Sequence, residues 1–388
     1  MEGVKYPAVD HEGTHSMKIG IIGAGIGGLV AALWLQRDGH QVDLFEQQAR
    51  PAAIGAGLSL FGNSFDALDA VGLGSLVRRV TSGEAAAFKA GQRSPSGAWM
   101  VVLPPKATAS LRAVHRAALH NALTEALTPG TLHLGADAAV SPEGAPEITV
   151  NGGTGHFDLV IAADGINSAA RQALGLDPGL RYAGYTAWRG VTDGPFDLGR
   201  EAGETWGRGE RFGMVPLPDG RVYWFATANL PPETRLADDR AELLCRFGSW
   251  HQPIAALLEN TAPDAVLKHD IRDLATPLPS YGRGRTLLLG DAAHAMTPDL
   301  GQGAGQAIED AAAIVLLARE GRLGLPSYDK ARRRRSQLIA SRSRVMGRVG
   351  QLSSPFAAGL RDAALRLVPG SVVGAAAVKF QAWAPPGR

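Results

Sequence analysis

The chain has 388 residues, of which 45% are hydrophobic and 20% are charged, and its formal net charge at pH 7 is +2. This composition excludes an intrinsically disordered chain and fits a globular protein of two or three domains. The small net charge gives no indication of a nucleic-acid partner. No apolar run reaches the roughly 18 residues needed to span a bilayer, so no stable membrane association is expected. The single cysteine, Cys245, excludes an intrachain disulfide and favours a cytoplasmic location.

The first motif of the chain is a GxGxxG sequence that follows a short apolar strand at residues 19–22. It comprises Gly23-Ala24-Gly25-Ile26-Gly27-Gly28. The first glycine allows a tight turn, the second lets a pyrophosphate approach the backbone, and the third lets a helix pack on the strand. A helical run at residues 29–37 and a second strand follow, and that strand ends at Glu46, an acid placed to bind a ribose hydroxyl. Residues 1–16, which precede this unit, are expected to be a leader or a disordered extension.

Two further motifs end apolar strands later in the chain. Residues 159–163 lead into Asp164-Gly165, which begins a DGxxSxxR sequence. Residues 286–289 lead into Gly290-Asp291, and a carboxylate at the end of a buried strand needs a partner. A glycine-rich loop then opens a helix, and the free N–H groups at its start favour an anion. The loop consists of Gly301, Gln302, Gly303, Ala304 and Gly305.

The chain divides into segments of different character. Residues 17–180 and 277–325 carry the three motifs and are expected to form one Rossmann-like α/β domain, with a helix near residues 63–76. Residues 181–276 combine aromatic side chains with alternating hydrophobicity, which predicts an inserted domain of mainly antiparallel sheet. Residues 326–388 are expected to form C-terminal helices.

The start of this C-terminal segment is basic, with four consecutive arginines from Arg332 to Arg335. A patch for nucleic acid or acidic lipid is one interpretation. Because Leu338, Ile339 and Val345 recur at helical spacing around the arginines, we favour the interpretation that the arginines form a solvated helix face.

The three motifs, in this order, resemble those of the single-component (class A) FAD-dependent aromatic hydroxylases, and the resemblance covers residues 17 to about 350. It implies an α/β fold like that of para-hydroxybenzoate hydroxylase: a Rossmann-like FAD-binding domain, an inserted antiparallel-sheet substrate domain and C-terminal helices. It also implies FAD contacts from Ser59 and Arg116, although Arg116 is equally interpreted as part of a helix salt bridge. No metal site is expected. The predicted FAD-binding residues are Gly23, Gly25, Gly27, Gly28, Glu46, Gln47, Ser59, Arg116, Asp164, Asp291, Gly301, Gln302, Gly303, Ala304 and Gly305.

The resemblance implies a monooxygenase that uses NADH or NADPH as cosubstrate. The chain has one GxGxxG unit, so the nicotinamide coenzyme is expected to bind transiently. In such enzymes O2 adds to the reduced FAD as a C4a-hydroperoxide, which hydroxylates a small planar aromatic or heteroaromatic substrate. The protein is expected to be a monomer or a homodimer.

Within that family, several stretches resemble the FAD-dependent urate hydroxylase, which implies catalytic roles for Arg211, Tyr223 and Asp299. Arg211 is expected to hold an anionic substrate, Tyr223 to steer it, and Asp299 to take part in proton transfer. Arg211 and Tyr223 share a sheet face if a three-residue turn joins their strands, and a two-residue turn would separate them. Ala187 stands where the urate enzyme has Asn, which counts against urate itself.

Other functions stay open at this level. The enzyme is alternatively a urate hydroxylase, or an epoxidase or hydroxylase of a larger isoprenoid or polyketide. A non-catalytic FAD-binding regulatory protein is a further alternative, but the intact loop at residues 298–305 argues against it, because that loop serves the flavin ring.

Overall fold

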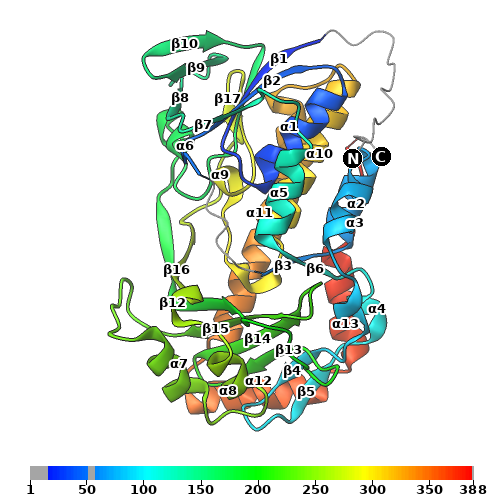
Figure 1. Cartoon of the computed structure of the whole chain (residues 1–388), viewed down its shortest axis with the longest axis vertical. Coiled ribbons are helices and arrows are strands. Elements are labelled where there is room, and N and C mark those ends of the chain that lie inside the picture. The colour runs from blue at the N-terminus through cyan, green and yellow to red at the C-terminus, as the bar shows by residue number, and fades with distance from the viewer. Residues whose placement is uncertain (1–15, 51–56, 387–388) are drawn as a thin grey trace.

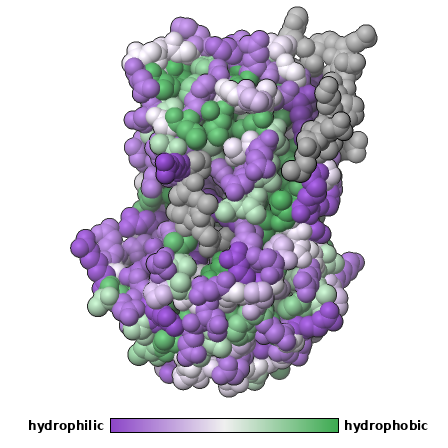
Figure 2. Space-filling view, in the orientation of Figure 1, coloured by the Kyte–Doolittle hydropathy of each residue, from purple (hydrophilic) through white to green (hydrophobic). Residues whose placement is uncertain are grey.

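The computed structural model describes residues 16–50 and 57–386, and two β-sheets organise this part of the chain. The sheets lie one above the other in Figure 1, and the long helix α11 (Leu325–Gly350) runs from the upper lobe to the lower one. Hydrophilic residues predominate on the visible face of the lower lobe (Figure 2).

The upper sheet is the Rossmann-like unit that the motifs predict. Its strand order is β17-β18-β11-β1-β2-β7, and all neighbouring pairs except β17·β18 are parallel. Helices α5 and α10 each pack against α1 beside it, and all three share its apolar core. Gly20 on β1 leaves room for Ile148 of β9, in a small antiparallel sheet β8–β10, and for Phe157, which follows β10. The elements of this lobe are β1 (Lys18–Ile22), α1 (Ile26–Arg37), β2 (Gln41–Glu46), α5 (Arg116–Glu125), β7 (Leu132–Leu134), β8 (Ala138–Val140), β9 (Glu147–Val150), β10 (Gly153–His156), β11 (Leu159–Ala162), α6 (Ala169–Ala173), β17 (Gly282–Arg283), β18 (Thr286–Leu288), α9 (Asp291–His294) and α10 (Gly303–Arg319).

The lower sheet has the order β16-β12-β15-β14-β13-β4-β5. It takes β4 and β5 from inside residues 17–180, so the substrate sheet is not a single insertion at residues 181–276. Strands β4 and β5 are only three and four residues long, and β4 has the polar sequence GQR, so neither is recognisable as a strand from its hydrophobic pattern. The bounds are β4 (Gly91–Arg93), β5 (Trp99–Val102), β12 (Leu180–Val191), β13 (Gly203–Trp206), β14 (Glu210–Pro216), β15 (Val222–Ala228), α7 (Asp239–Phe247), α8 (Ile254–Glu259) and β16 (Leu267–Leu274).

The two faces of the lower sheet have different tasks. Trp188, Phe212 and Trp224 lie on one face in an apolar core that also contains residues of α7 and α8. Alternation along β14 and β15 puts Arg211 and Tyr223 on the opposite face. Trp188 and Trp224 therefore belong to the apolar core of this lobe.

Short elements connect the lobes and close the chain. The helix expected near residues 63–76 is two helices, because Gly72 adopts a left-handed φ of 86° between them. The remaining elements are β3 (Gly57–Leu60), α2 (Gly62–Ala70), α3 (Gly74–Val80), α4 (Pro105–Thr108), β6 (Arg112–His115), the 3-10 turn η3 (Pro298–Leu300), α12 (Pro355–Leu367) and α13 (Gly370–Phe380).

No single helix in the described residues is long and apolar enough to cross a membrane. The consecutive helices α12 and α13 together reach the required length and hydropathy, but they meet at an angle of 95°.

Candidate active site

The three sequence motifs meet at one edge of the upper sheet. They follow β1, β11 and β18, which are adjacent and parallel, so their carboxyl ends point the same way. Glu46 ends β2, the neighbour of β1 on the other side. Ligands of open α/β sheets bind at this edge, and the loops therefore define one cofactor site.

The first loop has the close backbone approach that its glycines predict. Gly23 has a φ of 98°, and a Cβ at Gly23 or Gly28 would collide with neighbouring backbone carbonyl groups. A Cβ at Gly25 would meet no atom within 4 Å, so the backbone there faces open space. Glu46 accepts hydrogen bonds from the N–H groups of Ala24 and Gln48, each at 2.9 Å, and this fixes its carboxylate beside the loop.

The second loop is tied to the third by a buried arginine. Asp164 caps α6 by accepting the Ala170 N–H at 2.9 Å through Oδ2, while its buried Oδ1 has no partner among the described atoms. Arg171, which is 1% exposed, donates to the carbonyl of Ile166 at 2.7 Å and to that of Ala292 at 3.2 Å. The arginine of the DGxxSxxR sequence therefore joins two cofactor loops.

The third loop presents Asp291 to the same space. Within the described residues its carboxylate makes no recorded hydrogen bond, and the residue is exposed. The loop itself is held by Asp310 of α10, which accepts from the Gly290 N–H at 3.0 Å and contacts His294 Nε2 at 2.5 Å. Burial alone would raise the pKa of the Asp310 carboxyl, but His294 and Arg332 hold it below its usual value.

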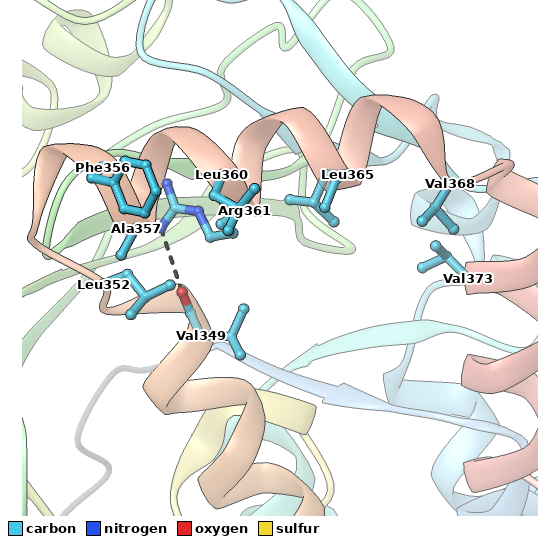
Figure 3. A pocket seen from close by; sticks show the side chains of 10 residues that line it. Val349, Leu352, Phe356, Ala357, Leu360, Arg361, Leu365, Val368 and Val373 are labelled. Atoms are coloured by element: carbon cyan, nitrogen blue, oxygen red, sulfur yellow. Dashed lines mark hydrogen bonds between the residues drawn. The ribbon is translucent and has the colours of Figure 1, made fainter.

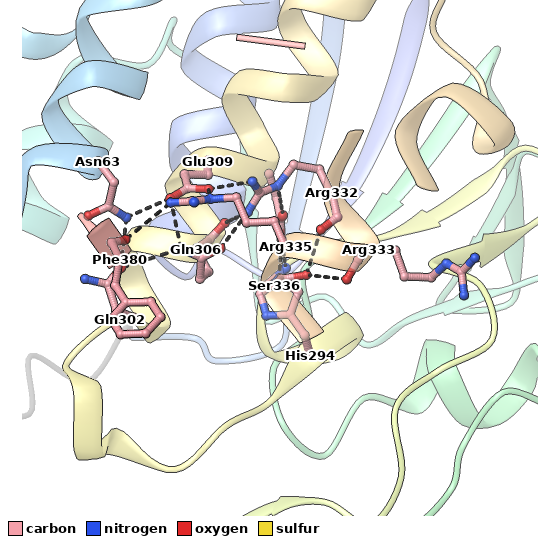
Figure 4. Close-up of polar contacts among 12 residues, drawn as sticks. Asn63, His294, Gln302, Gln306, Glu309, Arg332, Arg333, Arg335, Ser336 and Phe380 are labelled. Atoms are coloured by element: carbon pink, nitrogen blue, oxygen red, sulfur yellow. Dashed lines mark hydrogen bonds and ion pairs between the residues drawn. The ribbon is translucent and has the colours of Figure 1, made fainter. Parts of the chain in front are cut away.

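A buried ion network lies behind this loop and corrects the expectation of a solvated helix face for Arg332 and Arg335, whereas Arg334 is exposed as expected. Figure 4 shows Arg332 and Arg335 of α11 directed at Glu309 of α10. Arg332 is 1% exposed and also donates to Asp310 at 2.6 Å. The cause is the pair of acids on α10, whose side chains are fully buried and require cations.

The glycine-rich loop starts α10 beside these groups. Gly301 has a φ of 63°, and a Cβ at Gly303 would meet no atom within 4 Å, so this helix start also borders open space. The first N–H groups of a helix have no intrahelical acceptor and attract negative charge. The Gln302 side chain accepts from Asn63 Nδ2 at 2.8 Å, so its carboxamide oxygen is engaged within the fold, and its contact with FAD stays a prediction.

These observations fit a dinucleotide cofactor. The open space at Gly25 suits a pyrophosphate, Glu46 suits the ribose of the adenosine half, and Asp291 suits a hydroxyl of the flavin side chain. The start of α10 suits the electron-rich edge of a flavin. The predicted residues Gly27, Gln47, Ser59, Ala304 and Gly305 lie on or beside the same loops and on β3, but their contacts with FAD stay predictions.

A buried ion pair between Arg211 and Asp299 connects the two lobes. Arg211 of β14 donates to Asp299 Oδ1 at 2.5 Å, and the Tyr185 hydroxyl donates to Asp299 Oδ2 at 2.8 Å. Arg211 is 2% exposed and the Asp299 side chain is 0% exposed. Burial opposes the charge of Arg211, but the carboxylates of Asp299 and Glu204 raise the pKa of the guanidinium, so Arg211 stays charged.

Helix α11 makes room for this pair. A Cβ at Gly347 would collide with Asp299 Oδ2, and a Cβ at Gly350 would lie 3.0 Å from Arg211 Cδ. Gln351, just after the helix, accepts from Arg211 Nε at 3.0 Å. Arg211 is thus held by Asp299 and Gln351, with Glu204 3.7 Å away, and its contact with a substrate stays a prediction.

Tyr223 lies on the same face as Arg211, as the three-residue turn predicts. The Leu217 N–H donates to the Arg221 carbonyl at 2.8 Å, and Tyr223 pairs with Val215 in the register. The Tyr223 ring packs so closely on Gly57 of β3 that a Cβ there would collide with it. Burial raises the pKa of the Tyr223 hydroxyl, which has no recorded hydrogen-bond partner among the described residues.

A line of basic groups connects the substrate sheet with the cofactor loops. Burial lowers the pKa of His269, and the charges of Arg189 and Arg116 lower it further. Burial raises the pKa of Tyr223 and desolvation raises that of Asp291, while the charge of Arg189 lowers the former and the charge of Arg116 lowers the latter. Neither Arg189 nor Arg116 forms a recorded ion pair with another described residue, so the helix salt bridge considered for Arg116 is absent from this part of the chain.

Comparison with known proteins agrees with this geometry. Residues 16–343 match the family described as FAD binding domain. The chain therefore belongs to this FAD-binding family, and FAD is its cofactor.

Three similar proteins show where the chain lies within the family. The aurachin C monooxygenase/isomerase of Stigmatella aurantiaca is 36% identical, over 90% of this chain and 93% of that protein. The 2-heptyl-3-hydroxy-4(1H)-quinolone synthase of Pseudomonas aeruginosa is 33% identical, over 91% and 94%. The structure of Klebsiella pneumoniae HpxO complexed with FAD and uric acid aligns with a TM-score of 0.84 and 29% identity, over 94% of this chain and 96% of that one. These likenesses confirm the predicted fold class and the predicted resemblance to FAD-dependent hydroxylases.

Four residues at the Arg211–Asp299 pair were not among the predicted site residues: Tyr185, Gly347, Gly350 and Gln351. Tyr185 lies in one of the stretches that resemble the urate hydroxylase. The other three have only a weak sequence signal, the pair of glycines within a long basic helix, where glycine is otherwise unfavourable.

Proposed function

We propose that the protein is an NADH- or NADPH-dependent monooxygenase that hydroxylates a ring carbon of a heteroaromatic substrate, with a 2-alkyl-4(1H)-quinolone as the first substrate to test. The observation that carries this proposal is the arrangement of the FAD loops opposite a sheet face that presents Arg189 and Tyr223. Bound FAD supplies the oxygen chemistry, and the protein has to orient the substrate and exclude water.

Two observations favour a quinolone over a purine. Position 187 belongs to a small apolar cluster with Tyr185 and Ile271, where a substrate rich in N–H and C=O groups would find no partner. The relative from Pseudomonas aeruginosa is named for a heptyl quinolone product, and this chain covers 94% of that protein. Urate, the substrate suggested by the sequence motifs, is the second candidate because of the likeness to HpxO.

The roles of the three predicted catalytic residues follow from their contacts. Arg211 and Asp299 are proposed as positioning residues, because their buried pair fixes η3 and the flavin loop relative to the substrate sheet. Tyr223 is proposed to contact the substrate through its hydroxyl. Arg189, half-buried and without a recorded ion pair in the described chain, is proposed to stabilise the negative charge that an electron-rich ring develops.

The test is NADH and NADPH oxidation by FAD-loaded protein with 2-heptyl-4(1H)-quinolone, urate, salicylate and 4-hydroxybenzoate, with peroxide and product mass measured in parallel. We expect oxidation stimulated by the quinolone, little peroxide, and a product heavier by one oxygen atom. Coupled turnover with urate and with none of the other compounds would show that the substrate is urate and not a quinolone. No stimulation by any of the four compounds would remove the proposed substrate class, and an absence of turnover with every aromatic compound would favour a regulatory FAD-binding protein.

A further inference from the structure

Exposed apolar side chains are concentrated at the C-terminal end of the chain. In the described residues, eleven large hydrophobic side chains are exposed, and nine of them lie in residues 338–372. Only Val102 and Leu134 lie elsewhere. Monomeric proteins rarely leave such a cluster uncovered, so this surface needs an explanation.

Helix α12 exposes large apolar side chains and buries an arginine, the opposite of the usual arrangement in a surface helix. Phe356, Leu360 and Leu367 follow one another at helical spacing and are 81%, 64% and 83% exposed. Arg361 of the same helix points inward, where it donates to the carbonyls of Gly350 at 3.0 Å and Gly207 at 2.8 Å. A helix packed only by the hydrophobic effect would point its leucines inward, so the outer side of α12 is adapted to an apolar environment.

A groove continues this apolar surface. Figure 3 shows Leu360, Leu365 and Val368 along α12, with Val349 of α11 and Val373 of α13 across the opening. The groove has a volume of about 450 Å³, and Arg361 is the only charged residue among those that line it. Its size and lining suit a hydrocarbon chain.

The charge around this surface determines which occupant fits. Residues 338–386 contain six basic residues and one acid, Asp362, although the whole chain carries only +2. Arg344 pairs with Asp273 and Arg361 with Asp362. The other four, Arg342, Arg348, Arg366 and Lys379, form no recorded ion pair in the described part of the chain. A second copy would bring like charges together, whereas an anionic surface would neutralise them.

We propose that α12 and α13, with the end of α11, bind the surface of a bilayer that contains anionic phospholipid, with the apolar side of α12 in the acyl region and the free cations at the headgroups. A helix of 13 residues spans about 20 Å, too short to cross a hydrocarbon core of about 30 Å, so it lies in the interface. This proposal departs from the expectation of no stable membrane association, which rested on uninterrupted apolar runs and not on one side of a helix.

The test is flotation of FAD-loaded protein with vesicles of phosphatidylcholine alone or with phosphatidylglycerol added, at low and high salt. The triple variant Phe356→Ser, Leu360→Ser, Leu367→Ser removes the apolar stripe, and Leu134→Ser, an exposed leucine 45% accessible on β7, is the matched control. We expect binding to the anionic vesicles that high salt weakens and the triple substitution lowers by about tenfold or more, while the control binds normally. FAD content and circular dichroism verify that each variant is folded.

Three results would overturn the proposal. The wild-type protein fails to float with anionic vesicles, or the triple variant floats as well as wild type. Alternatively, sedimentation without vesicles shows a wild-type dimer that the triple variant dissociates, which would make a second copy the occupant. None of these outcomes depends on the proposed substrate, so this test and that of catalysis fail independently.

Discussion

Two buried arginines hold this molecule together, and they do so in different places. Arg332 binds Glu309 and Asp310 inside the FAD-binding lobe and so supports the loops that receive the cofactor. Arg211 binds Asp299 across the boundary between the substrate sheet and the flavin loop. The first pair supports the cofactor site, whereas the second sets the position of that site relative to the substrate. The same chemical interaction is therefore expected to have two different functional consequences.

The largest effect is expected from Arg332→Met. Two carboxylates with fully buried side chains would lose a partner, which destabilises the fold by about 3–5 kcal/mol. The measurement is urea unfolding together with FAD content, and the exposed neighbour Arg334→Met is the control. If Arg332→Met unfolds at the wild-type midpoint and retains FAD, the network is not what stabilises this lobe.

Asp291→Ala tests the cofactor lobe without disturbing its core. Its carboxylate has no recorded hydrogen bond or ion pair within the described chain, so the substitution is expected to leave stability unchanged and to weaken FAD binding by about tenfold or more. Fluorescence titration of apoprotein with FAD measures the change, with the surface substitution Asp43→Ala as control. Equal FAD affinity in both variants would exclude a cofactor contact by Asp291.

Arg211→Gln tests the boundary between the lobes. FAD retention is expected to persist, while coupled product formation falls by about 10²-fold and peroxide rises, because the flavin loop is no longer fixed against the sheet. Asp299→Asn should give the same pattern, and Arg211→Lys, which keeps the charge, should recover part of the coupling. If Arg211→Gln loses as much FAD as Arg332→Met does, the two arginines do not have different functions.

The smallest effect is expected from pH. Burial, Arg189 and Arg116 lower the pKa of His269 in the folded protein below its ordinary value of 6.5. The unfolded chain then binds the proton more readily, so stability falls as pH decreases below about 6.5. His269→Gln should reduce this acid destabilisation, as measured by thermal unfolding from pH 8 to pH 5. An identical pH profile in the variant would mean that His269 does not titrate near these arginines.

The cofactor lobe could be predicted well because its contacts depend on backbone. Glycine is required at positions 23, 25 and 28 by backbone conformation or by close approach, and a short sequence motif is enough to recognise such a requirement. Adjacent parallel strands also bring the loops at their carboxyl ends together, so the motifs predict one shared site. The sequence left open whether the turn after Leu217 has two or three residues, and the structure shows the three-residue turn that places Arg211 and Tyr223 on one face.

The boundary between the lobes could not be predicted in the same way. The partner of Arg211 lies 88 residues away, and the helix that encloses the pair lies still further along the chain. Local patterns cannot encode such pairings. The burial of Arg332 had a weak signal, since Glu309 and Asp310 interrupt an otherwise apolar helix and require a cation.

The wall that α11 forms beside Asp299 and Arg211 consists of backbone, because Gly347 and Gly350 face them. Side chains at these glycines would disturb the ion pair, since a Cβ at Gly347 would collide with Asp299 and one at Gly350 would press on Arg211. A change of substrate during evolution is therefore expected to occur on β12 and β15, where side chains line the opposite wall, and attempts to alter specificity by directed evolution should randomise those strands and leave α11 unchanged.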